Sequence, residues 1–177
     1  MQSLRLAHSN AKGYAENPDG WLVLIGETGR GKTHLAAAIA HNWQEKGLTV
    51  LFCVVPDLLE DLRSGYRDDH SAAPFDKSFE RIRAAEYLIL DDLGVHSATA
   101  WAQEKLFQIL NYRYNAKLPT VITIGCSLDA LPEAWVSRMY DPEVSMIFEV
   151  QAPDFRASLP RRVENKRGRR PGGPGGH

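Results

Sequence analysis

Glycines, a lysine and a threonine occur in a fixed spacing near the amino terminus of the chain. Residues 26–33 are Gly-Glu-Thr-Gly-Arg-Gly-Lys-Thr, that is, one glycine, four further residues and then Gly-Lys-Thr. Such glycines let the backbone wrap around a polyphosphate, so that successive amide groups point at its oxygens. In this pattern Lys32 neutralises the β and γ phosphates, and Thr33 offers its hydroxyl to Mg²⁺. The segment therefore predicts a nucleoside triphosphate site formed by Gly26, Glu27, Thr28, Gly29, Arg30, Gly31, Lys32 and Thr33.

Two adjacent carboxylates supply the other half of this chemistry. Asp91 and Asp92 follow directly after an apolar run. Because the carboxyl ends of neighbouring parallel strands converge on one crevice, both acids can face the glycine-rich loop. We expect Asp91 to hold Mg²⁺ together with Thr33, and Asp92 to orient and deprotonate an attacking water. Aspartates are also common in turns, so this prediction depends on the loop and the acids occurring together.

Alternating strands and helices must position these residues. Residues 21–25 are continuously apolar, which is typical of a strand covered on both faces, and they lead directly into the loop. From Thr33 onward apolar residues recur every four positions, which indicates a helix. Strands that alternate with helices predict an α/β fold, in which a parallel sheet carries helices on both faces. The further strands are expected over 48–55, 87–90, 120–124 and 145–150, and the further helices over 57–66, 75–85, 99–115 and 128–139.

Composition and charge divide the chain into three parts. The 177 residues are 44% hydrophobic and 24% charged, which is typical of a globular protein and excludes collagen-like and wholly disordered classes. The net charge of −1 conceals a basic carboxyl-terminal segment with seven lysines and arginines against one glutamate. We expect a helix and turn over 1–20, a nucleotide-binding domain over 21–155, and a disordered, basic, Gly/Pro-rich tail over 156–177. No apolar run approaches the ~18 residues of a membrane span, so we expect a cytoplasmic protein without a membrane partner.

The motifs together resemble a known family. They are similar to those of the AAA+ ATPase domain of DnaC-type replicative helicase loaders, of which IstB-type transposition ATPases are close relatives. The resemblance rests on residues 26–40, Leu88-Ile-Leu-Asp-Asp-Leu-Gly94, Ser137-Arg138 and Asp141-Pro142. It implies a P-loop NTPase of the ASCE class, a three-layer sandwich with a five-stranded parallel sheet of order 5-1-4-3-2. It also implies ATP and Mg²⁺ as ligands, and delivery of a replicative DNA helicase onto single-stranded DNA in replication.

The same resemblance gives Arg138 a role between subunits. Arg138 matches the position of an arginine finger, which reaches the γ-phosphate held by a neighbouring subunit, so the resemblance implies a homo-oligomer. Such a finger raises the rate by ~10³- to 10⁵-fold. The alternative is a helix-end arginine paired with Asp141 or another local carboxylate.

Two features depart from the family pattern. Family members usually end the fourth strand with Thr-Asn, and that asparagine, called sensor 1, hydrogen-bonds the γ-phosphate or the attacking water. Gly125 stands there in this chain, so unless Thr123, Cys126 or Ser127 compensates, we expect weak ATPase activity with ATP binding retained. Many AAA+ proteins also continue into a helical lid, whereas this chain passes into its basic tail, so no complete lid domain is expected.

Residues 57–85 occupy the place where related ATPases carry a helical element that touches single-stranded DNA. Aromatic side chains there could stack on bases and basic ones could contact phosphates, although acidic residues outnumber basic ones in this segment. An amphipathic packing element is an equally good interpretation. The candidates for DNA contact are Arg63, Tyr66, Arg67, Lys77 and Arg81, with Phe75, Phe79 and Arg83 beside them. The basic tail is a further candidate, against a merely solubilising terminus.

The function expected from all of this is an ATP-hydrolysing, DnaC-like helicase loader. One alternative is an IstB-like transposition ATPase. Another is a nucleotide-gated binding module that hardly hydrolyses ATP because Gly125 replaces sensor 1. A small-molecule P-loop kinase suits the length but needs neither the water-activating acids nor Arg138 acting on a neighbouring subunit. A GTPase is disfavoured because no Asn-Lys-x-Asp motif occurs.

Overall fold

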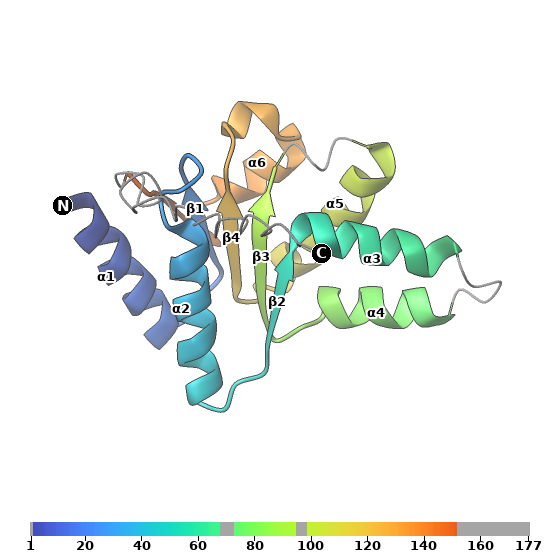
Figure 1. Ribbon diagram of the computed structural model, residues 1–177, viewed down its shortest axis with the longest axis horizontal. Coiled ribbons are helices and arrows are strands. Elements are labelled where there is room, and N and C mark those ends of the chain that lie inside the picture. The colour runs from blue at the N-terminus through green and yellow to red at the C-terminus, as the bar shows by residue number, and fades with distance from the viewer. Residues whose placement is uncertain (1, 68–72, 95–98, 152–177) are drawn as a thin grey trace, which may run out of the picture.

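The core of the molecule is a five-stranded parallel sheet. The computed structural model describes residues 2–67, 73–94 and 99–151. The strands lie in the order β2-β3-β4-β1-β5, which confirms the predicted order 5-1-4-3-2 read from the other edge (Figure 1). Strands β1 and β4 have the predicted bounds, since both are unbroken apolar runs. The five strands are β1 (Trp21–Ile25), β2 (Val50–Val54), β3 (Tyr87–Leu93), β4 (Thr120–Ile124) and β5 (Ser145–Glu149).

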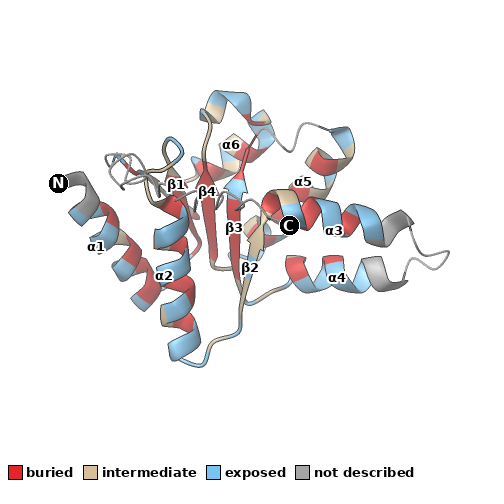
Figure 2. Cartoon of the chain, in the orientation of Figure 1, coloured by how far each residue is buried: buried red, intermediate tan, exposed pale blue. Residues whose placement is uncertain are grey.

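Helices cover both faces of the sheet and give the expected three layers. One apolar cluster joins one face of the sheet to α1 (Gln2–Glu16) and α2 (Lys32–Glu45). A second cluster joins the opposite face to the four remaining α-helices, and buried residues of every layer meet at the sheet (Figure 2). Those helices are α3 (Val55–Arg67), α4 (Ala73–Arg83), α5 (Ala100–Asn115) and α6 (Glu133–Met139).

The expectation of one helix over 128–139 is wrong. A 3-10 turn over Leu128–Ala130 is followed by an extended Leu131, and α6 begins only at Glu133. Pro132 explains the break, because a proline disfavours the helical conformation in the residue before it and has no amide hydrogen to donate. The short α6 nevertheless buries Trp135 and Met139 in the core.

A buried arginine fixes the amino ends of two neighbouring inner strands, β3 and β4. The Arg113 side chain on α5 is fully buried, and its Nε donates to Thr120 Oγ1 at 2.8 Å. Its terminal nitrogens donate to main-chain carbonyls that precede β3 and β4, at 3.2, 2.6 and 2.7 Å. Burial lowers the pKa of Arg113 to about 10, so it remains charged at neutral pH. Arg113 therefore ties together the loops that precede β3 and β4, the two strands that carry site residues at their other ends. The carbonyl partners are those of Arg83, Ala85 and Pro119.

Helix α1 is anchored to the core by its carboxyl-terminal half. The Tyr14 hydroxyl donates to the Gly20 carbonyl at 2.7 Å, and Trp43 Nε1 donates to the Ala15 carbonyl at 3.2 Å. None of the helices in the described ranges is long and apolar enough to cross a membrane.

Candidate functional site

The loop between β1 and α2 has the backbone conformation that the glycine pattern predicts. Gly29 and Gly31 have φ angles of 85° and 91°, in the left-handed region that favours glycine. Gly26 has a φ of 155°, and a Cβ atom there would lie 2.7 Å from the Val150 carbonyl oxygen. Glu27 and Arg30 form an ion pair across the outside of the loop. The glycines are therefore required by backbone geometry, independently of any ligand.

Lys32 begins α2, and its ammonium group turns back onto the loop. Lys32 is buried, and its Nζ donates to the carbonyl oxygens of Gly26 at 2.7 Å and Glu27 at 2.8 Å. Burial lowers the pKa of Lys32, while the nearby carboxylates of Asp92 and Asp91 act in the opposite direction. Among the described residues this buried ammonium group has no ion-pair partner, and its place at a helix amino terminus fits a polyphosphate.

Asp91 lies where the sequence predicts a magnesium ligand. Its carboxylate is buried, and Oδ1 accepts hydrogen bonds from the Thr33 hydroxyl at 3.0 Å and from the Thr123 hydroxyl at 2.6 Å. Within the described ranges, no three His, Cys, Asp or Glu side chains gather to hold a metal ion by themselves. Thr33 and Asp91 fit Mg²⁺, which typically takes one or two protein ligands and completes its shell with phosphates and water.

Asp92 is exposed and has a left-handed backbone conformation, with a φ of 60°. Its amide donates to Thr123 Oγ1 at 2.9 Å, so one hydroxyl contacts both acids. Aspartate tolerates this conformation better than most residues, and it coincides with an irregularity in the pairing of β3 with β4, where Asp91 is buried and Asp92 is exposed. The two acids therefore differ in environment, as their different expected roles require.

Thr123 is the site residue that sequence reasoning misjudged. It was a candidate to replace the missing sensor 1, but it is 1% exposed and its hydroxyl is already used by Asp91 and Asp92. The parallel pairing of β3 and β4 explains the double contact, because it places the ends of both strands side by side. The Ser127 hydroxyl accepts a hydrogen bond from the Asp129 amide at 3.4 Å, in the turn that follows β4. The Cys126 sulfur lies 3.5 Å from where a Cβ would stand on Gly94.

Arg138 lies on the face of the sheet opposite α2. Its terminal nitrogens donate to the Ala134 carbonyl and to Asn111 Oδ1, both at 2.6 Å. Its guanidinium also lies over the rings of Phe107 and Tyr114, at 4.9 and 5.5 Å. The alternative pairing with Asp141 is not what the structure has, because Asp141 accepts a hydrogen bond from Tyr114 instead. All these contacts are with α5 and α6, so Arg138 does not join the loop of its own chain.

The α3–α4 hairpin packs through its apolar side. Phe79 is buried, which contradicts a role in stacking on bases, and Arg83 is paired with Glu80 at 2.7 Å. Arg63 is exposed and lies over the Trp101 ring at 5.3 Å. Lys77 is exposed on α4. The side chains of Tyr66, Arg67 and Phe75, and the whole of the basic tail, lie outside the described residues.

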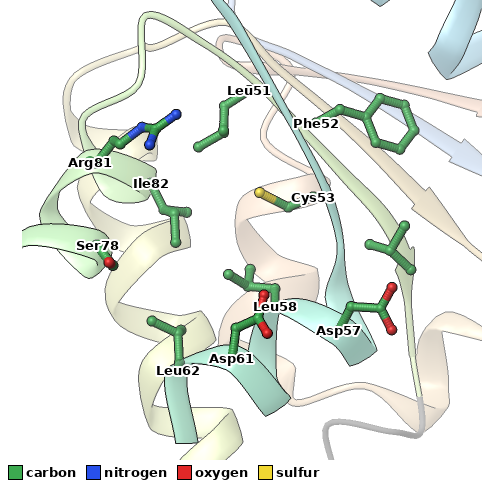
Figure 3. Close-up of a pocket in the computed structure, with 11 residues that line it drawn as sticks. Leu51, Phe52, Cys53, Asp57, Leu58, Asp61, Leu62, Ser78, Arg81 and Ile82 are labelled. Atoms are coloured by element: carbon green, nitrogen blue, oxygen red, sulfur yellow. The ribbon is translucent and has the colours of Figure 1, made fainter. Parts of the chain in front are cut away.

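Arg81 lines a hollow at the free edge of the sheet rather than an open basic surface. The hollow has a volume of about 470 Å³ and lies between β2, α3 and α4 (Figure 3). Cys53 points into it from the strand, with Arg81 on one side and Asp57 and Asp61 on the other (Figure 3). Burial raises the pKa of the Cys53 thiol to about 11, so that thiol is protonated at neutral pH. The mixed charges of this hollow do not favour a nucleic-acid phosphate.

Comparisons with known proteins give the family of the chain and its relatives. A family model described as IstB-like ATP binding protein matches residues 9–147. The chain is 30% identical over 122 residues to the replicative helicase loader DnaI of Bacillus subtilis, covering 68% of this chain and 38% of that protein. It is 26% identical over 138 residues to the replicative helicase loader DnaC of Escherichia coli K12, covering 76% and 56%. The chain thus spans about half or less of the length of these relatives.

Solved structures show the same fold. A crystal structure of the DnaC helicase loader has a TM-score of 0.72 at 28% identity, covering 84% of this chain and 90% of that one. AMPPCP-bound DnaA from Aquifex aeolicus has a TM-score of 0.72 at 22% identity, covering 85% and 47%, and shows the fold alone. The sheet order, the loop and the two acids are those expected of an AAA+ P-loop ATPase. Since the family model matches most of its length, the chain belongs to the IstB-like ATP-binding protein family.

Proposed function

We propose that the chain binds ATP with Mg²⁺ and hydrolyses it to ADP and phosphate. The observation that carries this proposal is the meeting of Lys32, Thr33 and the two acids at the carboxyl ends of β1 and β3. Bound Mg²⁺ would neutralise charge that develops on the phosphates. The loop amides and Lys32 bind the triphosphate, Thr33 and Asp91 hold the ion, and Asp92 accepts a proton from the attacking water. The water oxygen then bonds to the γ-phosphorus, and the bond from that phosphorus to the β–γ bridging oxygen breaks, leaving its electron pair on ADP.

The biological role that we propose is loading a replicative DNA helicase onto single-stranded DNA. Support comes from the DnaI and DnaC relatives, which are named replicative helicase loaders, and from the likeness to the DnaC crystal structure. Assembly into a homo-oligomer belongs to this proposal, because Arg138 contacts Asn111 and Phe107 of its own chain, away from the loop, so a role in hydrolysis would require the loop of a neighbouring subunit. Arg63 and Lys77, exposed on α3 and α4, are the described candidates for DNA contact.

Two alternative functions are each favoured by one specific observation. The match to the IstB-like model favours a transposition ATPase. The glycine at position 125 favours a nucleotide-gated binding module with little turnover, since no side chain there can hydrogen-bond the γ-phosphate.

The test measures ATP affinity and the single-turnover rate of phosphate release, each with and without single-stranded DNA. An ATPase loader binds ATP and releases phosphate faster in the assembled state, and Lys32→Ala weakens ATP binding and abolishes nucleotide-dependent assembly. Unchanged affinity without turnover under any condition favours the binding module. Capture of partners from the native cell extract, with ATP present, separates the loader from the transposition ATPase, because the first retains a helicase and the second a transposase.

A further inference from the structure

Gly125, directly after the fourth strand, puts no side chain into the gap between Asp92 and the glycine-rich loop. A Cβ atom on Gly125 would stand 3.4 Å from Asp92 Oδ1 and 4.0 Å from Thr28 Oγ1. Gly125 therefore separates an exposed carboxylate from an exposed hydroxyl that belongs to the glycine-rich loop. Both groups face the position from which an asparagine side chain would otherwise extend.

The Thr28 hydroxyl is the polar group near Gly125 that remains uncommitted. Thr123 is engaged by both acids, and Ser127 caps the turn that follows β4. Thr28 has no hydrogen bond to any part of the chain that the structure describes, and its side chain is exposed. Its position in the loop places it beside the phosphates that the loop would bind.

We propose that Thr28 replaces sensor 1 by positioning the attacking water together with Asp92. This inference rests on the proposed ATPase function. A water in the gap donates one hydrogen to the Asp92 carboxylate and the other to Thr28 Oγ1, which leaves a lone pair directed at the γ-phosphorus. The Thr28 hydroxyl keeps its own hydrogen, which it can donate to a γ-phosphate oxygen. Thr28 is thus a positioning residue, and Asp92 remains the proton acceptor.

A double-mutant cycle on Thr28 and Gly125 tests this proposal. Thr28→Val keeps the branched shape and removes the hydroxyl, and Thr28→Ser keeps the hydroxyl. We expect Thr28→Val to slow single-turnover phosphate release by about 10- to 100-fold with ATP affinity changed less than about twofold. Thr28→Ser should restore most of the lost rate. Gly125→Asn is sterically possible, since Gly125 has no left-handed φ, and it should accelerate the Thr28→Val variant far more than the wild-type chain.

The matched control is Thr49→Val, because Thr49 is exposed at the opposite end of the sheet, before β2, and should leave the rate unchanged. The proposal is overturned if Thr28→Val keeps the wild-type rate. It is also overturned if Thr28→Val loses ATP affinity as much as rate, or if Gly125→Asn accelerates both backgrounds equally.

The same measurements distinguish a failure of the proposed ATPase function from a failure of the proposed role of Thr28. If the wild-type chain binds ATP without turnover and Gly125→Asn gains turnover, the ATPase site is correct and Thr28 does not replace sensor 1. If neither chain releases phosphate, both the hydrolysis and the role of Thr28 are refuted.

Discussion

Replacing Thr123 with valine removes the single hydroxyl that joins the two acids. Thr123 Oγ1 donates to Asp91 Oδ1 at 2.6 Å and accepts from the Asp92 amide at 2.9 Å, at a position that is 1% exposed. Valine has nearly the same shape, so the change removes hydrogen bonds without opening a cavity. The perturbation is therefore confined to the polar contacts of Asp91 and Asp92.

The expected cost follows from those two contacts. A hydrogen bond to a charged group contributes ~1.5 to 3 kcal/mol, and loss of an acceptor for a partly buried amide costs about 1 kcal/mol. We therefore expect the free energy of unfolding to fall by about 2.5 to 4 kcal/mol. The left-handed conformation of Asp92 itself costs ~1 to 2 kcal/mol. Loss of the hydrogen bond from its amide should therefore let the Asp92 backbone relax to another conformation and move the carboxylate. Phosphate release should then slow more than ATP affinity falls, because Lys32 and the loop are untouched.

Urea unfolding measures the stability change, while equilibrium ATP binding and single-turnover phosphate release measure the functional one. Thr123→Ser is the matched control, because it keeps the hydroxyl and removes only a buried methyl group, at about 1 kcal/mol. Equal stability of the valine variant and the wild-type chain would refute the reasoning. So would a serine variant that loses as much stability as the valine variant.

Three further changes test other parts of the molecule. Lys32→Ala should weaken ATP binding by about 100-fold, because it removes a charge-assisted contact worth ~3 kcal/mol, and an affinity within threefold of wild type by calorimetry would contradict this. Arg138→Ala should leave ATP affinity intact and lower the turnover of the assembled protein by ~10³-fold, and normal turnover by Arg138→Ala would refute the intersubunit role. Arg113→Met should lower the free energy of unfolding by about 3 to 5 kcal/mol in urea, since three carbonyls lose their donor, whereas Arg63→Met should change it by less than about 0.5 kcal/mol.

The parts of the fold that sequence could predict are those with a local signal. The apolar runs 21–25 and 120–124 match β1 and β4 to the residue, and the glycine pattern places Lys32 at the start of α2. The long-range contacts have no such signal. The hydrogen-bond acceptors of Arg113 lie in two loops that are far apart in the sequence. Its burial could therefore not be predicted before the sheet was known.

The same contrast applies within the site. The glycine-rich loop and the two acids were predictable because each is a contiguous motif that directly follows an apolar run typical of a strand. The double contact of Thr123 was not, since a threonine in an apolar strand is equally well explained by its β propensity. Pro132 did carry a local signal, but the apolar spacing on either side of it masked the break.

The groups expected to bind ATP and those expected to promote its hydrolysis differ in how firmly the fold holds them. Lys32 and Asp91 are buried and hydrogen-bonded to the loop and to strand β4, so their geometry exists before any ligand arrives. Asp92 is exposed, its amide makes one hydrogen bond, and the neighbouring Gly125 has no side chain to contact it. Preorganised contacts favour affinity, whereas turnover requires groups that act on the transition state. A substitution near Gly125 should therefore change rate without affinity, and one near Lys32 should change affinity first. Because these two sets of groups can vary independently, the ratio of turnover to affinity distinguishes an ATPase loader from a nucleotide-gated module.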